Sequence, residues 1–430
     1  MTEFLKTLLI CVLTVTMVLL TVCFFIVTVS SDALSPRDLV FEATRSSRTE
    51  SSEKDVSGTQ LQTAAFPCQI AFFSGMGRLY MPLSHQEYSE ALSSTEQFFE
   101  EAIGSCYDYR QSSETDYLLS LLEQGILWVY DYPMPFYMLS RWADYDYALQ
   151  DISVSSMFAC VKDSSVTLYV KDSAGAYHCF STQADGAFIT RTCATFSPNG
   201  VISAMTNSRN TADDVLILSG GFSLPCYSVN TGYSGDNTEI SRTVMTRLSI
   251  NPYLSSVYRD GDTTIYIEGS SRLHLYADRH LSYTVTDQSG GIPLSIPSDV
   301  SRQDSLLAMI EGVRAIVFGL WDDLSSDSVQ LSLTSISEND GAYTLYFDAY
   351  IGGCYISRGD IAAAAALVEN GKITSLSIYP LSLHRTKDSS VLPFAQAQAA
   401  ASDKAVLRVQ YVLGDENILV PILADVKGGN

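Results

Sequence analysis

Histidines, cysteines and glycine pairs are the residue types in this 430-residue chain that could carry catalysis, metal binding or phosphate binding. The five histidines form no H-E-x-x-H arrangement, which would place two zinc ligands and a general base on one helix face. His274 and His280 fall within one predicted hairpin, where a metal pair is an alternative. No cysteine or carboxylate pattern completes a ligand set, so ordinary strand histidines are the favoured interpretation. The sequence predicts no catalytic residues, no metal and no cofactor.

The cysteines are scattered and odd in number outside the apolar N-terminal segment. None is paired at C-x-x-C spacing, which argues against a zinc site or a redox motif. Buried free thiols are the favoured interpretation. A disulfide between Cys179 and Cys193, across a predicted hairpin, is the alternative in an oxidising compartment.

Three glycine pairs and one acidic pair invite a functional interpretation. Gly220-Gly221, Gly290-Gly291 and Gly352-Gly353 lack the G-x-x-x-x-G-K-[ST] context of a phosphate loop, so they are interpreted as turns or bulges. Asp322-Asp323 ends a predicted helix where the macrodipole disfavours acid, which would suit a cation site; a solvated loop start is favoured. The 25 tyrosines would suit a sugar-binding surface, although tyrosine is also a common strand residue.

An uncharged apolar run from Thr7 to Val29 covers 23 residues and predicts a single transmembrane helix. Lys6 is the only basic side chain before the run, so the charge that normally marks the cytoplasmic side is weak. Long domains translocate largely regardless of flanking charge, and the short N-terminus is therefore predicted to be cytoplasmic. A cleaved signal peptide ending near Val29 is the alternative, disfavoured by the length of the run. A lipoprotein cysteine at Cys23 is disfavoured because no small residue precedes it.

The apolar run also contains the most regular pattern in the sequence. Threonines recur at intervals of seven, and a second set of residues follows the first three of them by four positions, as in the a/d seam of paired helices. The predicted seam consists of Thr7, Cys11, Thr14, Val18, Thr21, Phe25 and Thr28. Small and hydroxyl-bearing residues of this kind permit close helix–helix packing in lipid. The alternative is that each threonine bonds its own helix and contacts no partner.

Composition limits the classes of partner. The formal net charge of −22 makes nucleic acid an improbable partner, because binding a polyanion needs a Lys/Arg surface. It also disfavours lying flat on an anionic leaflet. Hydrophobic residues make up 46% of the chain, enough for well-formed cores after the apolar run.

Hairpins alternating with helices predict an α+β fold of mainly antiparallel sheets, with helices packed on one face, in an extracytoplasmic multi-domain region. The predicted parts are a cytoplasmic N-terminus (1–6), a transmembrane helix (7–29), a flexible tether (30–64), an N-terminal α/β domain (65–152), a middle β region (153–232), a helix-plus-strands module (233–300) and a C-terminal α+β module (301–430).

Local signals predict individual elements within this plan. Ser84 and Glu87 form a capping box at a helix start, and the apolar spacing predicts a further helix over 303–321. Asn370-Gly371 predicts a two-residue hairpin turn. The run AFITRT, at 187–192, is predicted to be one of the short strands of the middle β region.

The order of these parts resembles the YycH/YycI family, membrane-anchored accessory proteins of the WalK/WalR two-component system in Gram-positive bacteria. The resemblance rests on GILWVYDYPMPFYML, on the block DGDTTIYIEGSSRLHLYADRHLSYTVTD, and on the run from YFDAYIGGCYISRG through NGKITSLSIYPL to VQYVLGDENILVPILADV. The C-terminal module would then be YycH/YycI-like.

The resemblance implies a non-enzymatic regulator of a sensor histidine kinase in the cell membrane, acting through transmembrane and extracytoplasmic contacts and commonly with a sister protein. The transmembrane seam is then a candidate kinase-binding face. Two alternatives remain: an extracytoplasmic binding protein for a cell-envelope ligand, with tyrosine-rich strands as its surface, and an envelope hydrolase with an unrecognised site.

Overall fold

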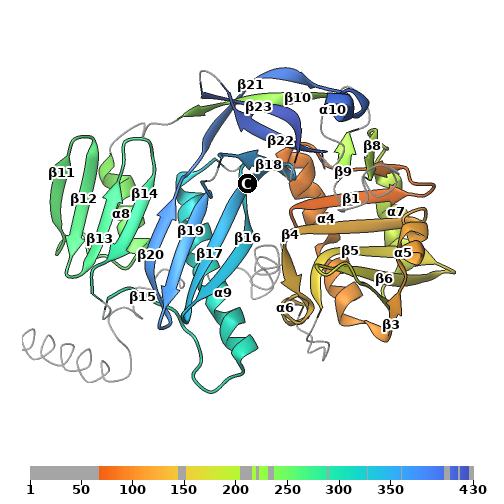
Figure 1. Ribbon diagram of the computed structural model, residues 1–430, viewed down its shortest axis with the longest axis horizontal. Helices are drawn as coiled ribbons and strands as arrows, with labels where there is room; N and C mark the ends of the chain where they lie inside the picture. The colour runs from red at the N-terminus through yellow and green to blue at the C-terminus, as the bar shows by residue number, and fades with distance from the viewer. Residues whose placement is uncertain are drawn as a thin grey trace, which may run out of the picture. The chain divides into compact units, whose positions relative to one another are not determined.

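The structure, a computed structural model, describes residues 67–143, 152–203, 216–218, 222–230, 237–287, 290–326, 328–359, 361–400, 407–414 and 417–425. These residues form a mixed α+β fold whose strands belong to two sheets, here called sheet A and sheet B (Figure 1). All strand pairs are antiparallel except β18 with β22.

Sheet A takes its strands from the first half of the described chain, in the spatial order β3-β7-β6-β5-β4-β1-β2-β8-β9. Its strands are β1 (Gln69–Ser74), β2 (Leu79–Tyr80), β3 (Tyr107–Ser112), β4 (Gln124–Pro135), β5 (Ser153–Lys162), β6 (Ser165–Asp172), β7 (Tyr177–Thr182), β8 (Val201–Ser203) and β9 (Leu216–Leu218).

Both faces of sheet A are covered, which explains why its strands read as continuous apolar runs. Successive residues of β1 point to opposite faces of the sheet, so Phe72 and Phe73 belong to different hydrophobic clusters. The helices α4 (His85–Gly104) and α7 (Gly186–Thr195) pack on the Phe72 face. The helix α5 (Glu114–Ser120) packs its Tyr117 on the other face. This differs from the predicted single covered face.

The start of α4 confirms the predicted capping box. Ser84 accepts from the backbone N–H of Glu87, and the Glu87 carboxylate accepts from the backbone N–H of Ser84. The helix then carries Phe98 and Phe99 against Trp128 of β4, with ring centroids 6.4 and 5.4 Å away.

The strand predicted at AFITRT is wrong: these residues lie in α7. Asp185 caps the helix by accepting from the backbone N–H of Ala187. Ile189 and Cys193, four residues apart, are the buried positions of the helix. The cap and this spacing outweigh the strand preference of the β-branched residues.

Sheet B has the order β11-β12-β13-β14-β20-β19-β17-β18-β22-β23-β10-β21, with β15 beside β20 and β16 beside β17. Its strands are β10 (Phe222–Asn230), β11 (Ser256–Asp260), β12 (Thr263–Glu268), β13 (Ser271–Leu275), β14 (Leu281–Val285), β15 (Ile292–Pro293), β16 (Gln330–Asn339), β17 (Ala342–Ile351), β18 (Cys354–Ser357), β19 (Ala364–Glu369), β20 (Lys372–Ile378), β21 (Ser382–Val391), β22 (Leu407–Leu413) and β23 (Ile418–Asp425).

The helices associated with these later segments are α8 (Asn237–Arg247), α9 (Arg302–Leu324) and α10 (Phe394–Ala400), and α6 (Phe136–Trp142) follows β4. The predicted helix over 303–321 is confirmed as α9. The predicted turn at Asn370-Gly371 is confirmed between β19 and β20, with positive φ angles of 50° and 71° as a type I′ turn requires.

The predicted transmembrane helix (7–29), the tether (30–64) and all seam residues lie outside the described residues and stay predictions. Within the described ranges, no helix is both long and apolar enough to span a bilayer. The sheets do not follow the predicted ectodomain ranges, since β4 and β5 pair across the boundary between 65–152 and 153–232.

Candidate functional site

Two charged residues lie inside apolar strands of different sheets and bind each other. Asp131 belongs to β4 and Arg408 to β22. The Arg408 guanidinium donates to both carboxylate oxygens of Asp131, at 2.9 and 3.0 Å. Because the residues are 277 positions apart in the chain, this inter-sheet ion pair joins distant segments. Its bidentate geometry is the strongest form that an arginine–carboxylate contact takes.

The path of β4 explains why Asp131 can leave sheet A. The pairing of β4 with β5 is interrupted between Val129 and Met134. Pro133 lies in this interval and has no N–H to donate to a ladder. Such irregularities redirect side chains, and here the interval contains the carboxylate that reaches sheet B.

Aromatic rings enclose the inter-sheet ion pair. The guanidinium of Arg408 lies 5.8 Å from the ring centroid of Tyr350 and 5.7 Å from that of Tyr355. The Tyr350 hydroxyl also donates to Asp131. Burial alone would lower the pKa of Arg408, but the Asp131 charge outweighs it and raises this pKa, so the pair stays charged. These four residues are called the inter-sheet polar centre.

Two further titratable groups border this centre without becoming reactive. The Cys68 thiol donates to the carbonyl of Val129 at 3.2 Å. Burial, and then the Asp131 charge, raise the pKa of Cys68 well above its ordinary value, so the thiolate that a nucleophile requires is disfavoured. Burial likewise raises the pKa of Asp348.

Gly352 and Gly353 form the turn between β17 and β18 and bring sheet B close to the start of α4. Both have positive φ, 54° and 74°. A Cβ on Gly352 would lie 2.7 Å from the backbone of Leu83, and one on Gly353 would lie 3.1 Å from the carbonyl of Cys68. This glycine pair therefore allows a close backbone approach as well as a turn.

A second group of contacts between α6 and α9 lies beside the centre. The Trp142 indole donates to Glu311 at 2.8 Å. Arg314 of α9 lies 5.5 Å from the Trp142 ring, and burial lowers its pKa to about 9. A recess lined in part by Asp131, Arg314 and Ser332 has a volume of about 10 Å³, room for one water molecule but no substrate.

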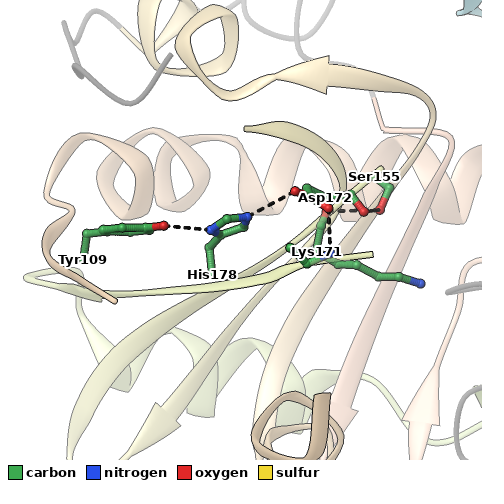
Figure 2. Close-up of polar contacts among 6 residues, drawn as sticks. Tyr109, Ser155, Lys171, Asp172 and His178 are labelled. Carbon is green, nitrogen blue, oxygen red and sulfur yellow. Dashed lines mark hydrogen bonds and ion pairs between the residues drawn. The ribbon is translucent and has the colours of Figure 1, made fainter. Parts of the chain in front are cut away.

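A hydrogen-bonded chain of Tyr109, His178 and Asp172 lies at the edge of sheet A (Figure 2). His178 is 3.1 Å from the Tyr109 hydroxyl and 3.3 Å from the Asp172 carboxylate. An acid–histidine order of this kind can serve a general base. Here it ends at a phenol that is 43% exposed on the outer strand β3, so it ends at solvent. We interpret it as a clamp that holds β3 on β7.

The histidines at 274 and 280 lie in a stack of rings. His274 stacks on Tyr276, Tyr276 on His280, and His280 on Tyr379 with centroids 3.9 Å apart. Burial lowers the pKa of His280. Among the residues that the structure describes, no three His, Cys, Asp or Glu side chains are grouped to hold a metal ion.

The predicted alternative disulfide between Cys179 and Cys193 is wrong, because both thiols are free and buried. Cys179 of β7 and Cys193 of α7 enter hydrophobic clusters on opposite faces of sheet A. The favoured prediction of buried free thiols is confirmed for the cysteines of the described chain. Burial raises the pKa of Cys106, Cys160, Cys193 and Cys354 to about 12, which leaves these thiols protonated.

The acidic pair predicted at the end of a helix falls in α9. Asp323 accepts from Arg247 of α8 at 2.9 Å, so the acid that the helix dipole disfavours is offset by a neighbouring arginine. This contact between α8 and α9 offsets the charge of Asp323 without a bound metal ion.

Asp131 and Arg408 belong to none of the motifs predicted from the sequence. A signal for both was present, since charged residues inside apolar runs are rarely buried unless paired. Asp131 interrupts ILWVYDY, and Arg408 interrupts AVLRVQYVL. The two apolar runs do not reveal that Asp131 and Arg408 bind each other.

Comparisons with known proteins give one structural likeness. No protein-family model matches the chain, and no curated protein matches it in sequence. The crystal structure of YycH from Bacillus subtilis is similar, with a TM-score of 0.53 and 11% sequence identity. The likeness covers 84% of this chain and 96% of that chain, so the two share a fold.

The ion pair yields a prediction about stability. Arg408→Met leaves the Asp131 carboxylate, whose side chain is only 22% exposed, without its cation, and is expected to lower the free energy of unfolding by up to about 3 kcal/mol. Adding Asp131→Asn to this variant removes the orphaned charge and is expected to recover part of the loss. Urea unfolding of the full chain measures both changes.

The matched control is Arg302→Met, which removes an exposed ion pair with Glu338. It is expected to leave the unfolding midpoint almost unchanged. An Arg408→Met variant as stable as the parent, or one made less stable by adding Asp131→Asn, would contradict the role given to the pair.

Proposed function

We propose that this protein is a non-enzymatic, membrane-anchored regulator of a sensor histidine kinase of the WalK type. The observation that carries the proposal is the shared fold with YycH, which extends over most of both chains. The order of parts predicted from the sequence resembles the same YycH/YycI family, while no protein-family model matches the chain.

The chemistry of the described residues supports action by contact. The buried Arg408 binds the partly buried Asp131 across the sheets, and the recess beside them admits one water molecule. The thiols at 106, 160, 193 and 354 are held protonated by burial. These groups stabilise the fold. This suits a protein that functions through contacts of its surface with a partner.

The proposed topology places residues 7–29 across the membrane and the two sheets outside the cytoplasm. The net charge of −22 favours an extracytoplasmic region that stays soluble and away from anionic lipid. The seam of Thr7, Cys11, Thr14, Val18, Thr21, Phe25 and Thr28 is the proposed contact with the kinase's own transmembrane helix, with a sister accessory protein as a further partner.

The regulatory role is tested by deleting the gene and measuring phosphorylation of the response regulator that the partner kinase serves. We expect the phosphorylated fraction to change, and the full-length gene supplied in trans to restore it. A chain in which a cleavable signal peptide replaces residues 7–29, so that the rest is still exported, is the control, and it is expected not to restore regulation. An unchanged phosphorylated fraction in the deletion strain would contradict the proposed function.

The seam has its own prediction. Replacing Thr14 and Thr21 together by leucine removes two hydroxyls and adds bulk at the proposed contact, so association with the kinase in a membrane two-hybrid assay is expected to fall about tenfold. Thr16→Leu, off the seam in the same helix, is the control and should have no effect. Equal association of all three proteins would rule out the seam and leave the regulatory role to other contacts.

A further inference from the structure

The strand β11 is the outer strand at one end of sheet B (Figure 1). It pairs with β12 along its whole length, from Ser256 opposite Ile267 to Asp260 opposite Thr263, without a bulge. In the part of the chain that the structure describes, no strand pairs with its other side. One edge of sheet B is therefore regular and open.

The backbone groups on the open side can be assigned from the hairpin. A two-residue loop, 261–262, joins β11 to β12, so Asp260 and Thr263 form the hydrogen-bonded pair that closes it. Bonded and non-bonded pairs alternate along an antiparallel ladder. The N–H and C=O groups of Val257 and Arg259 consequently point outward. These are the donors and acceptors that an added strand uses.

Apolar side chains flank this open edge. Val257 and Tyr258 of β11 are 54% and 56% exposed, and Tyr253 and Leu254 just before the strand are 88% and 72% exposed. Tyrosine and leucine left this exposed next to an unpaired edge form a surface that favours association.

The outer strand of sheet A shows how an edge is protected in the same protein. The pairing of β3 with β7 is irregular between Tyr107 and Arg110, and Asp108 there has a φ of +51°. The Tyr109 hydroxyl is hydrogen-bonded to His178 of the neighbouring strand β7 (Figure 2). Both strands carry one arginine and one aspartate, but only β3 has a bulge, and a bulged edge resists strand addition.

We propose that β11 binds an extended segment of another protein as an additional strand, and that this segment alternates apolar with basic residues. The outward backbone groups require a peptide in the β conformation, and the exposed apolar side chains favour apolar residues on it. Basic residues are favoured by Asp260 and Asp262 at the end of the hairpin and by the net charge of −22. The same charge on each copy disfavours a second copy of this chain as the occupant.

The test uses the full chain in detergent and a short acetylated, amidated peptide in which valine alternates with lysine and threonine. We expect binding with a Kd below about 1 mM. Amide hydrogen exchange is expected to slow at Val257 and Arg259. A peptide with glutamate in place of lysine should bind about tenfold more weakly.

Two changes separate strand addition from general stickiness. Val257→Pro removes one outward backbone N–H, and an edge strand tolerates proline at such a position. Val257→Thr keeps this N–H. We expect Val257→Pro to abolish binding and Val257→Thr to retain it. A peptide N-methylated at alternate residues tests the same backbone bonds without altering the protein, and it should not bind.

Several results would overturn the proposal. The valine–lysine peptide would fail to bind, or the N-methylated peptide would bind as tightly as the unmethylated one. Slowed amide exchange found only at residues outside 253–260 would also contradict it. A concentration-dependent dimer of the chain that Val257→Pro dissolves would instead assign the edge to a second copy.

Discussion

The bidentate contact between Asp131 and Arg408 is the interaction on which the arrangement of the two sheets depends. Each residue is a charge within an apolar strand, and each would be costly to bury without the other. Around them, the rings of Tyr350 and Tyr355 lie against the Arg408 guanidinium, and the glycine turn at Gly352-Gly353 lets the backbones approach. Because the two strands are 277 residues apart in sequence, this contact joins an early segment of the described chain to a late one.

The same features explain why the titratable groups around this contact are unreactive. A carboxylate bound by an arginine is already neutralised, and thiols whose pKa is raised by burial are poor nucleophiles. Two of the outer strands differ: β3 is bulged and hydrogen-bonded through Tyr109 to His178, whereas β11 is regular and flanked by exposed apolar residues.

Features encoded by neighbouring residues were predictable from the sequence. The capping box at Ser84, the helix α9 and the Asn370-Gly371 turn each follow from residues within a few positions of one another. The AFITRT segment was mispredicted because its β-branched residues favour a strand while the Asp185 cap favours a helix. Apolar runs such as ILWVYDY could be recognised as strands, but not as strands covered on both faces.

The candidate site was less predictable, because it depends on partners far apart in the chain. The sequence shows a charge in each of two apolar strands, and only the fold pairs Asp131 with Arg408. Cys179 and Cys193 illustrate the opposite case, in which residues near in sequence lie on opposite faces of a sheet. Side-chain direction at both places is set by tertiary packing, which local propensity does not contain.

The most direct test is whether the two sheets unfold together. Amide hydrogen exchange follows β4 of sheet A and β17 of sheet B in one and the same protein. Unfolding curves in urea are recorded for peptides that cover each of the two strands, in the parent chain and in Arg408→Met. Their midpoints are predicted to coincide when Arg408 is present and to separate in the Arg408→Met background. Midpoints that differ with Arg408 in place, or that still coincide without it, would contradict the claim that the ion pair joins the sheets.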